Sequence, residues 1–255
     1  FLDLWGKAPF KTTYDIYELP VEKAGKDLYD WIDQELTDIE PQLAEVGEFN
    51  NSANFGRADK GAAYMLHARL ALNSEVYTKG AVKDYQKAID YCNLLDGKYE
   101  LSKAEKNGYT GYEQVFMADN DQNVQAMKEI ILPIRQDGAK TKCYSGANYL
   151  VSSTRITGMP YIGTSNGWSC NFSRAALVKK FFSTIEDCPL ATEAAPKDAT
   201  EADIIALDKA AGTTTKDVQA KANDDRALFY SGCGGGLRKL QADQIAGFNS
   251  GLSIV

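Results

Sequence analysis

The segment between residues 59 and 77 constrains the fold most, because its apolar residues fall on two faces at helical spacing. The two faces consist of Ala58, Ala62, Met65 and Leu72, and of Ala63, Leu66, Leu70 and Tyr77. A helix that is apolar on two sides lies between neighbouring helices. Its alanines, at positions 62, 63, 68 and 71, allow those neighbours to approach closely. The sequence therefore predicts a mainly helical protein built around this segment.

An amphipathic helix is expected on each side of this segment. Apolar residues recur at three- and four-residue steps over residues 20–43 and again over residues 85–95. Pro20 suits the first turn of the first helix, Pro41 loosens its end, and Gly97 suits the C-cap of the second. The second helix is expected to bury Tyr85, Ala88, Ile89, Cys92 and Leu95. Such antiparallel helices resemble a tetratricopeptide-like hairpin, which needs further helical pairs to cover its faces.

Beyond residue 98 the helical periodicity becomes intermittent. Residues 138–171 are rich in Gly, Ser, Asn, Thr and aromatic side chains, and they fit no helical period. We expect a long irregular loop region there, and loops of this length in a folded domain are usually functional. Smaller elements are expected as extended pieces at 99–101 and 129–134, helices near 112–117, 173–186 and 201–211, and a strand beginning at 225–230.

The expected architecture is a single, mainly α domain with four parts and a few short strands. These parts are tetratricopeptide-like helices over 1–98, a loop-rich ligand-binding region over 99–188, a surface insertion over 189–223 and a continuation over 224–255. The chain opens on Phe1-Leu2-Asp3 without a Met, and we expect the domain to be incomplete at both ends.

Charge and cysteine spacing exclude several classes of function. A net charge of −7 argues against binding along a nucleic-acid backbone. No apolar run approaches the roughly 18 residues of a membrane span. The cysteines are unevenly spaced and form no C-x-x-C pair, which argues against a zinc ribbon or a dithiol redox centre. Most are expected to be buried as small apolar side chains, and one disulfide is compatible with the sequence; they are Cys92, Cys143, Cys170, Cys188 and Cys233.

The sequence matches no complete catalytic or cofactor-binding motif. His67 is the one histidine and lies in the doubly apolar helix, which favours a structural role over that of a general base. The glycine-rich run at 231–236 lacks the Gly-Lys-Ser/Thr ending of a phosphate-binding loop. The run at 119–123 resembles the start of a calcium loop but has Val124 and Ile130 at the positions that need Gly and Glu. No enzyme activity, cofactor or metal is predicted.

A binding signal remains in the loop-rich region. Sugar rings present apolar C–H faces edged by hydroxyl groups, so a site for them needs flat aromatic side chains beside Asn or Arg side chains. One stretch supplies both kinds, as Tyr144, Asn148, Tyr149, Arg155, Tyr161, Asn166, Trp168 and Asn171. The alternative is that these aromatic side chains pack the loop onto the helices.

Several motifs together resemble the SusD/RagB family, nutrient-binding outer-membrane lipoproteins of Bacteroidetes. Phe55-Gly56-Arg57-Ala58-Asp59-Lys60-Gly61-Ala62-Ala63 is similar to the signature helix of that family. Other matches follow in the family's order, including Leu2-x-Leu4-Trp5-Gly6-Lys7, Tyr112-Glu113-x-Val115-Phe116, Gly167-Trp168 and Asp224-Asp225-Arg226.

The resemblance implies a function as well as a fold. It implies tetratricopeptide-like helical pairs and a non-catalytic glycan site in loops, to which Trp168 contributes. It also implies a TonB-dependent transporter of the SusC type as partner, and a lipid anchor outside this chain that holds the protein at the outer-membrane surface. Family members are about twice as long, so the chain is expected to be a central portion. The competing hypothesis is a tetratricopeptide-type scaffold that binds a protein partner.

Overall fold

The computed structural model describes residues 1–50, 53–135, 140, 146–155, 164, 167–168, 170–173, 175–184, 187–190, 213–230 and 253–254. It divides into two compact units where the sequence predicts one domain. The first unit comprises Phe1–Asn107 and Asp119–Arg135, and the second comprises Gly108–Ala118 and Gln136–Val255. Each unit has its own buried core, so each is described by itself.

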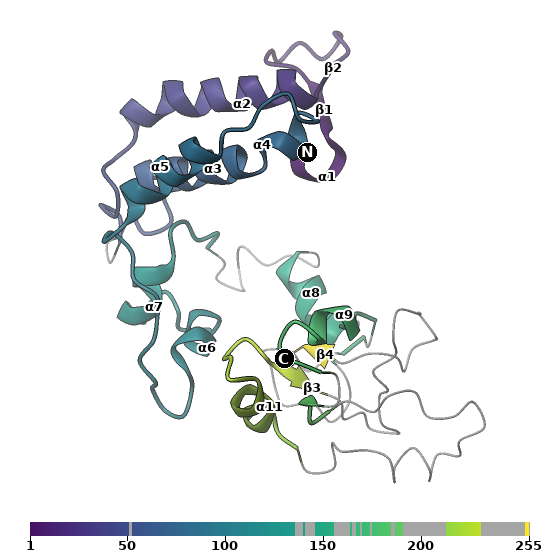
Figure 1. Ribbon diagram of the computed structural model, residues 1–255. Coiled ribbons are helices and arrows are strands. Elements are labelled where there is room, and N and C mark those ends of the chain that lie inside the picture. Colours follow the sequence, from purple (N-terminus) through teal and green to yellow (C-terminus); the bar gives the residue numbers. More distant parts are fainter. Residues whose placement is uncertain are drawn as a thin grey trace, which may run out of the picture. The chain divides into compact units, whose positions relative to one another are not determined.

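The first unit is mainly helical, as predicted (Figure 1). Its longest helix, α2 (Gly25–Ile39), is followed by the 3-10 turn η1 (Glu40–Gln42), which is the loosening predicted at Pro41. The predicted central helix forms as α3 (Lys60–Leu72) and α4 (Ser74–Tyr77). The other elements are α1 (Leu2–Trp5), β1 (Lys7–Phe10), β2 (Val21–Ala24), α5 (Tyr85–Leu95) and α7 (Val124–Glu129).

Helix α3 packs between α2 and α5, and small residues make this packing close. Asp59 begins the helix, and its carboxylate accepts hydrogen bonds from the amides of Gly61 (2.8 Å) and Ala62 (3.2 Å). Gly61 lies against Tyr99, where an added Cβ would be 2.2 Å from the phenolic oxygen. The alanine-rich face is buried, and the neighbouring core contains Leu2, Ala8, Leu28, Tyr29, Leu36 and Leu70.

A polar network joins the three helices at the middle of α3. His67 is fully buried, and its ring stacks on Tyr91 at 4.3 Å. Its Nδ1 lies 3.0 Å from Asp33 Oδ1, and Lys87 Nζ donates to both oxygens of that carboxylate at 2.6 Å. Burial lowers the pKa of His67, although Asp33 opposes the shift, so the ring is neutral at pH 7 and Nδ1–H donates to Asp33.

The helix predicted from residue 20 begins later than its periodicity suggests. Residues 21–24 form β2, which pairs antiparallel with β1 in the register Lys7↔Ala24 and Phe10↔Val21. Gly25 then takes a φ of +50°, and the helix starts there. The prediction that Pro20 lies in the first turn of the helix was therefore wrong. Pairing of residues 21–24 with β1, a segment distant in sequence, outweighs their local helical periodicity.

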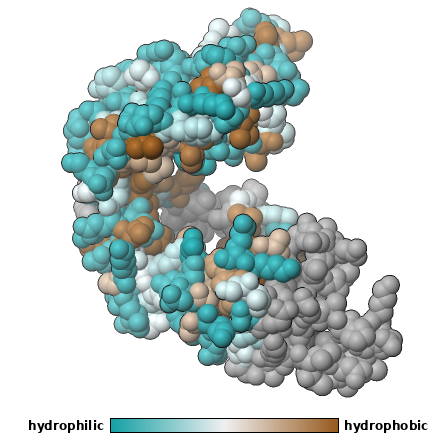
Figure 2. Space-filling model, viewed as in Figure 1, coloured by the Kyte–Doolittle hydropathy of each residue, from teal (hydrophilic) through white to brown (hydrophobic). Residues whose placement is uncertain are grey.

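The burial predicted for α5 is also only partly correct. Ala88 and Leu95 are buried, but Ile89 is 53% exposed and Cys92 is exposed. On α3, Leu66 is 48% exposed, so this helix is not covered all round by the described residues. Figure 2 shows apolar patches among the mainly hydrophilic residues of the surface. Gly97 does follow the helix with a φ of +69°, as its predicted C-cap role requires.

The second unit contains short elements around a separate core. These are α6 (Gly111–Val115), α8 (Ala147–Thr154), α9 (Ala175–Val178), α11 (Thr215–Ala222) and the paired strands β3 (Phe229–Tyr230) and β4 (Ser253–Ile254). The core consists of Val178, Phe182, Cys188, Leu190, Val218, Ala227 and Phe229. Two of these residues, Leu190 and Val218, fall within the range predicted as a surface insertion. That part of the prediction was wrong; the helix predicted near 201–211 lies outside the described residues.

Candidate ligand-binding site

Helix α8 forms within the stretch predicted as irregular, and its polarity explains why periodicity missed it. The helix buries Ser152 and Ser153, whereas Tyr149 and Leu150 are 47% and 60% exposed. Its two serines thus face inward and its large apolar side chains outward, whereas an ordinary surface helix buries its apolar face. The hydroxyl of Ser153 donates back to the carbonyl of Leu150 at 2.9 Å, which satisfies it without an apolar contact.

The chain returns across the end of α8 and brings Trp168 to it. The Trp168 amide donates to the carbonyl of Ser152 at 2.8 Å. The amides of Cys170 and Asn171 both donate to the carbonyl of Ser153 at 2.9 Å. Because the last carbonyls of a helix have no partner within it, these bonds complete the end of α8 and fix the position of the returning segment.

Gly167 makes this close approach sterically feasible. A Cβ at this position would lie 2.7 Å from the carbonyl oxygen of Arg155. The Gly167-Trp168 pair therefore has a local explanation, in which the glycine lets the backbone touch the helix end and the tryptophan follows at the surface.

Tyr149 and Trp168 consequently lie beside each other although they are far apart in sequence. Their ring centroids are 5.9 Å apart, and the ring planes meet at 54°. Both side chains are about half exposed, at 47% and 48%. Packing of the loop would bury such rings, so their exposure favours the binding interpretation over the packing alternative. Together they form an open, bent aromatic surface that we call the aromatic platform.

The predicted polar residues divide into two kinds. Asn148 is exposed on α8, next in sequence to Tyr149. Arg155 is partly buried directly after the helix. Asn171 is partly buried, and its side-chain amide donates to Ser153 Oγ at 2.6 Å, which gives it a role in holding the loop. The structure thus brings Tyr149 and Trp168 together and leaves Asn148 exposed on α8; Tyr144, Tyr161 and Asn166 lie outside the described residues.

The residues considered for catalysis have structural roles where the structure describes them. His67 is sequestered in the network with Asp33. Asn123, at the end of the run that resembles a calcium loop, caps α7 by accepting from the amides of Gln125 and Ala126. The described residues include no cluster of His, Cys, Asp and Glu that fits a metal ion. Cys92 and Cys170 are exposed thiols, so the predicted burial is wrong for these two, whereas Cys188 is buried as predicted. The glycine-rich run at 231–236 lies outside the described residues.

By its fold and its exposed platform, the chain is a mainly helical protein with a candidate ligand-binding surface. No protein-family model matches it. It is 52% identical, over 260 aligned residues that cover the whole chain, to the starch-binding protein SusD of Bacteroides thetaiotaomicron. The chain belongs to the SusD-like family, as its ordered motifs indicate. It spans 45% of the length of this relative.

Proposed function

We propose that this protein is a non-catalytic binder of oligosaccharide or polysaccharide, and that the aromatic platform contacts the sugar. The observation that carries the proposal is the exposed Tyr149–Trp168 pair, and Asn148 is an exposed amide next in sequence to Tyr149. Sugar C–H faces stack on aromatic rings, and an amide side chain can exchange two hydrogen bonds with neighbouring hydroxyls. The starch-binding relative supports a glycan ligand and makes starch the first one to test.

The angle within the platform favours one shape of glycan. Rings that meet at 54° cannot both lie flat against a straight, ribbon-like chain. They can contact two sugar rings of a chain that turns between residues, as helical α-linked glucans do. We therefore expect maltooligosaccharides to bind more tightly than cellooligosaccharides of the same length.

Titration calorimetry with both series of oligosaccharides tests this function. Trp168→Ala should weaken maltooligosaccharide binding by about 1–3 kcal/mol while the thermal unfolding midpoint is retained. Trp5→Ala is the matched control, because Trp5 is 63% exposed and lies in the other unit. Wild-type protein that binds neither series would refute the proposal. A large fall in the unfolding midpoint for Trp168→Ala would assign that residue to packing.

The cellular setting forms part of the same proposal. We infer that the protein works at the outer-membrane surface with a SusC-like TonB-dependent transporter, through a lipid anchor carried outside this chain. Among the described residues, no helix combines the length and the apolar character needed to cross a membrane. Co-purification of the transporter with the full-length protein tests the partnership. Release of reducing sugar by purified protein would contradict the non-catalytic role.

A further inference from the structure

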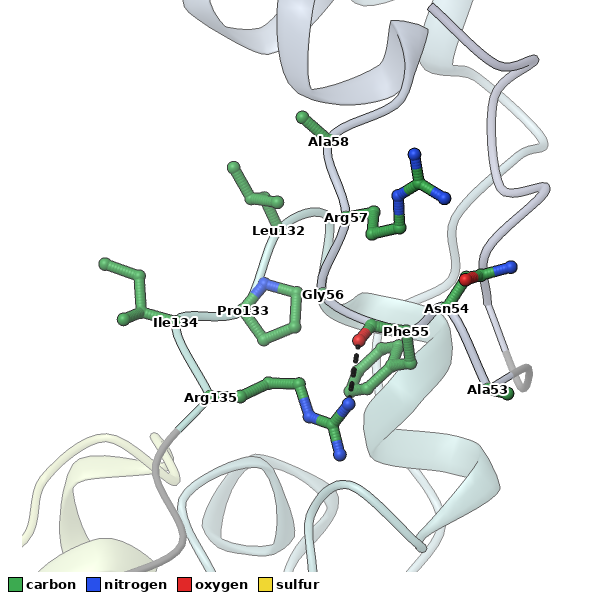
Figure 3. A pocket seen from close by; sticks show the side chains of 10 residues that line it. All are labelled: Ala53, Asn54, Phe55, Gly56, Arg57, Ala58, Leu132, Pro133, Ile134 and Arg135. Atoms are coloured by element: carbon green, nitrogen blue, oxygen red, sulfur yellow. Dashed lines mark hydrogen bonds between the residues drawn. The ribbon is translucent and has the colours of Figure 1, made fainter. Parts of the chain in front are cut away.

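A groove of about 540 Å³ lies in the first unit and shares no residue with the aromatic platform. One wall is the loop over residues 53–58, which precedes α3, and the other is the extended segment over residues 132–135, which follows α7. Figure 3 shows the two segments crossing at Gly56 and Pro133. Both walls belong to one compact unit, so the groove is defined within that unit.

Gly56 holds one arginine of this groove in place. With a φ of +95°, it adopts a conformation that favours glycine, and an added Cβ would lie 2.8 Å from Cδ of Arg135. The aliphatic part of Arg135 therefore packs directly on the glycine. Its Nη1 donates to the carbonyl of Phe55 at 3.3 Å, which further limits where the guanidinium can go (Figure 3).

The second arginine, Arg57, is oriented by an aromatic ring. Its guanidinium lies 5.1 Å from the centroid of the Phe49 ring, within the range of a cation–π contact. In the view of Figure 3 the side chains of Arg57 and Arg135 extend to the same side, each from one of the two segments that meet at Gly56 and Pro133. The groove thus contains two positive groups that the fold has partly oriented.

These positive groups have no carboxylate partner among the described residues. Among the residues that the structure describes, Arg57 and Arg135 are the only charged ones that line the groove. Neither takes part in an ion pair within the described part of the chain. This stands out in a protein with a net charge of −7, where acidic partners are plentiful. The charge of the groove is therefore available to an anion from solution.

The remaining lining is apolar, and this narrows the class of anion. Pro133, Leu132 and Ile134 contribute apolar surface, and the last two are 43% and 89% exposed. A small inorganic ion would leave this surface uncovered. A planar carboxylate matches the fork of an arginine guanidinium with two parallel hydrogen bonds. An attached ring or chain could cover the proline at the same time.

We propose that this groove binds an organic carboxylate, with the carboxylate between Arg57 and Arg135 and an apolar face of the molecule against Pro133. Two sources share this chemistry, an acidic sugar such as a uronate and a free organic acid, and the experiment below distinguishes them. The proposal does not rest on the aromatic platform, because the two sites have no residue in common.

Calorimetric titration of the protein at low ionic strength tests the proposal with glucuronate, benzoate, glucose and sulfate as probes. We expect the two carboxylates to bind at least about tenfold more tightly than glucose or sulfate, and their binding to weaken as NaCl is added. Tighter binding of glucuronate than of benzoate would identify an acidic sugar as the source, and the reverse order a free organic acid.

Arg57→Gln and Arg135→Gln should each weaken carboxylate binding about tenfold, because each removes one charge-assisted contact. Arg69→Gln is the matched control, since Arg69 is exposed on α3 and does not line the groove. Trp168→Ala should leave carboxylate binding unchanged, which separates this test from that of the platform. The proposal is overturned if sulfate or glucose binds as tightly as the carboxylates, if no probe saturates, or if both arginine variants bind like the unsubstituted protein.

Discussion

Replacing Gly61 by alanine tests the reason for the glycine at the start of α3. The new Cβ would lie 2.2 Å from Tyr99 Oη, 3.0 Å from Asp59 Oδ1 and 3.2 Å from Tyr99 Cζ. An overlap of this size forces the tyrosine or the helix to move, and overpacking of a core costs about 1–3 kcal/mol. The higher helix propensity of alanine offsets up to about 1 kcal/mol of this loss in stability. We therefore expect a net loss of about 1–2 kcal/mol in the free energy of unfolding.

Tyr99→Phe supplies the second arm of a double-mutant cycle. Burial raises the pKa of Tyr99 to about 12, and its hydroxyl has no hydrogen-bond partner among the described residues. Removing that hydroxyl should therefore cost little by itself. It also removes the nearest atom to the new Cβ, so Gly61→Ala should cost at least about 1 kcal/mol less in the Tyr99→Phe background.

Urea unfolding of the four proteins, followed by far-ultraviolet circular dichroism, measures the two differences. Equal costs of Gly61→Ala in both backgrounds would refute the assignment of the glycine to its contact with Tyr99. A stabilising Gly61→Ala in the unsubstituted background would show that helix propensity outweighs the contact.

Three further predictions concern the polar network and the platform. Asp33→Ala should lower the free energy of unfolding by about 2–3 kcal/mol in urea, because it leaves the buried Nδ1–H of His67 without its acceptor. Because burial lowers the pKa of His67, the unfolded chain binds protons first, and stability should fall as pH drops below about 6.5. His67→Gln should remove that component from a pH series of urea midpoints. Gly167→Ala should weaken maltooligosaccharide binding about tenfold or more in calorimetry, because its Cβ meets the carbonyl of Arg155 and shifts Trp168.

Controls distinguish these predictions from general loss of stability. Asp38→Ala, on the exposed surface of α2, should change the urea midpoint far less than Asp33→Ala. A pH dependence that persists unchanged in His67→Gln would contradict the role given to this histidine. Normal glycan binding by Gly167→Ala would show that the return of the chain across α8 does not position the platform.

The sequence predicts elements whose physical cause is local. The alanine-rich faces predict the buried helix α3, and the glycine after α5 predicts where that helix ends. Both signals lie within a few residues of the feature they predict, and the structure has both features. Strand β2 escaped prediction because its pairing partners on β1 lie 11 to 17 residues away in sequence and its own residues also fit a helical period. Only the pairing decides between the two.

The candidate site depends even more on contacts between residues that are distant in sequence, which local patterns do not predict. The sequence shows the aromatic residues of the loop region, but it does not predict α8, because this helix buries serines and therefore lacks an apolar helical periodicity. The contact between Tyr149 and Trp168 depends on backbone hydrogen bonds from one end of the loop to the other. No periodicity encodes such a contact. Likewise, Arg57 stands in the family motif, yet its proximity to Arg135 follows only from the crossing at Gly56.

The inverted polarity of α8 has a thermodynamic consequence for the platform. The described contacts that hold this helix to the returning loop are hydrogen bonds and the ring contact between Tyr149 and Trp168, whereas Leu150 and Tyr149 keep about half of their surface in water. Local opening of α8 should therefore expose little new apolar surface and carry a small heat-capacity change. Such an element is held by enthalpy and loosens steadily on warming. A binding surface built in this way would release its ligand more readily on warming than a site lined by buried apolar side chains would.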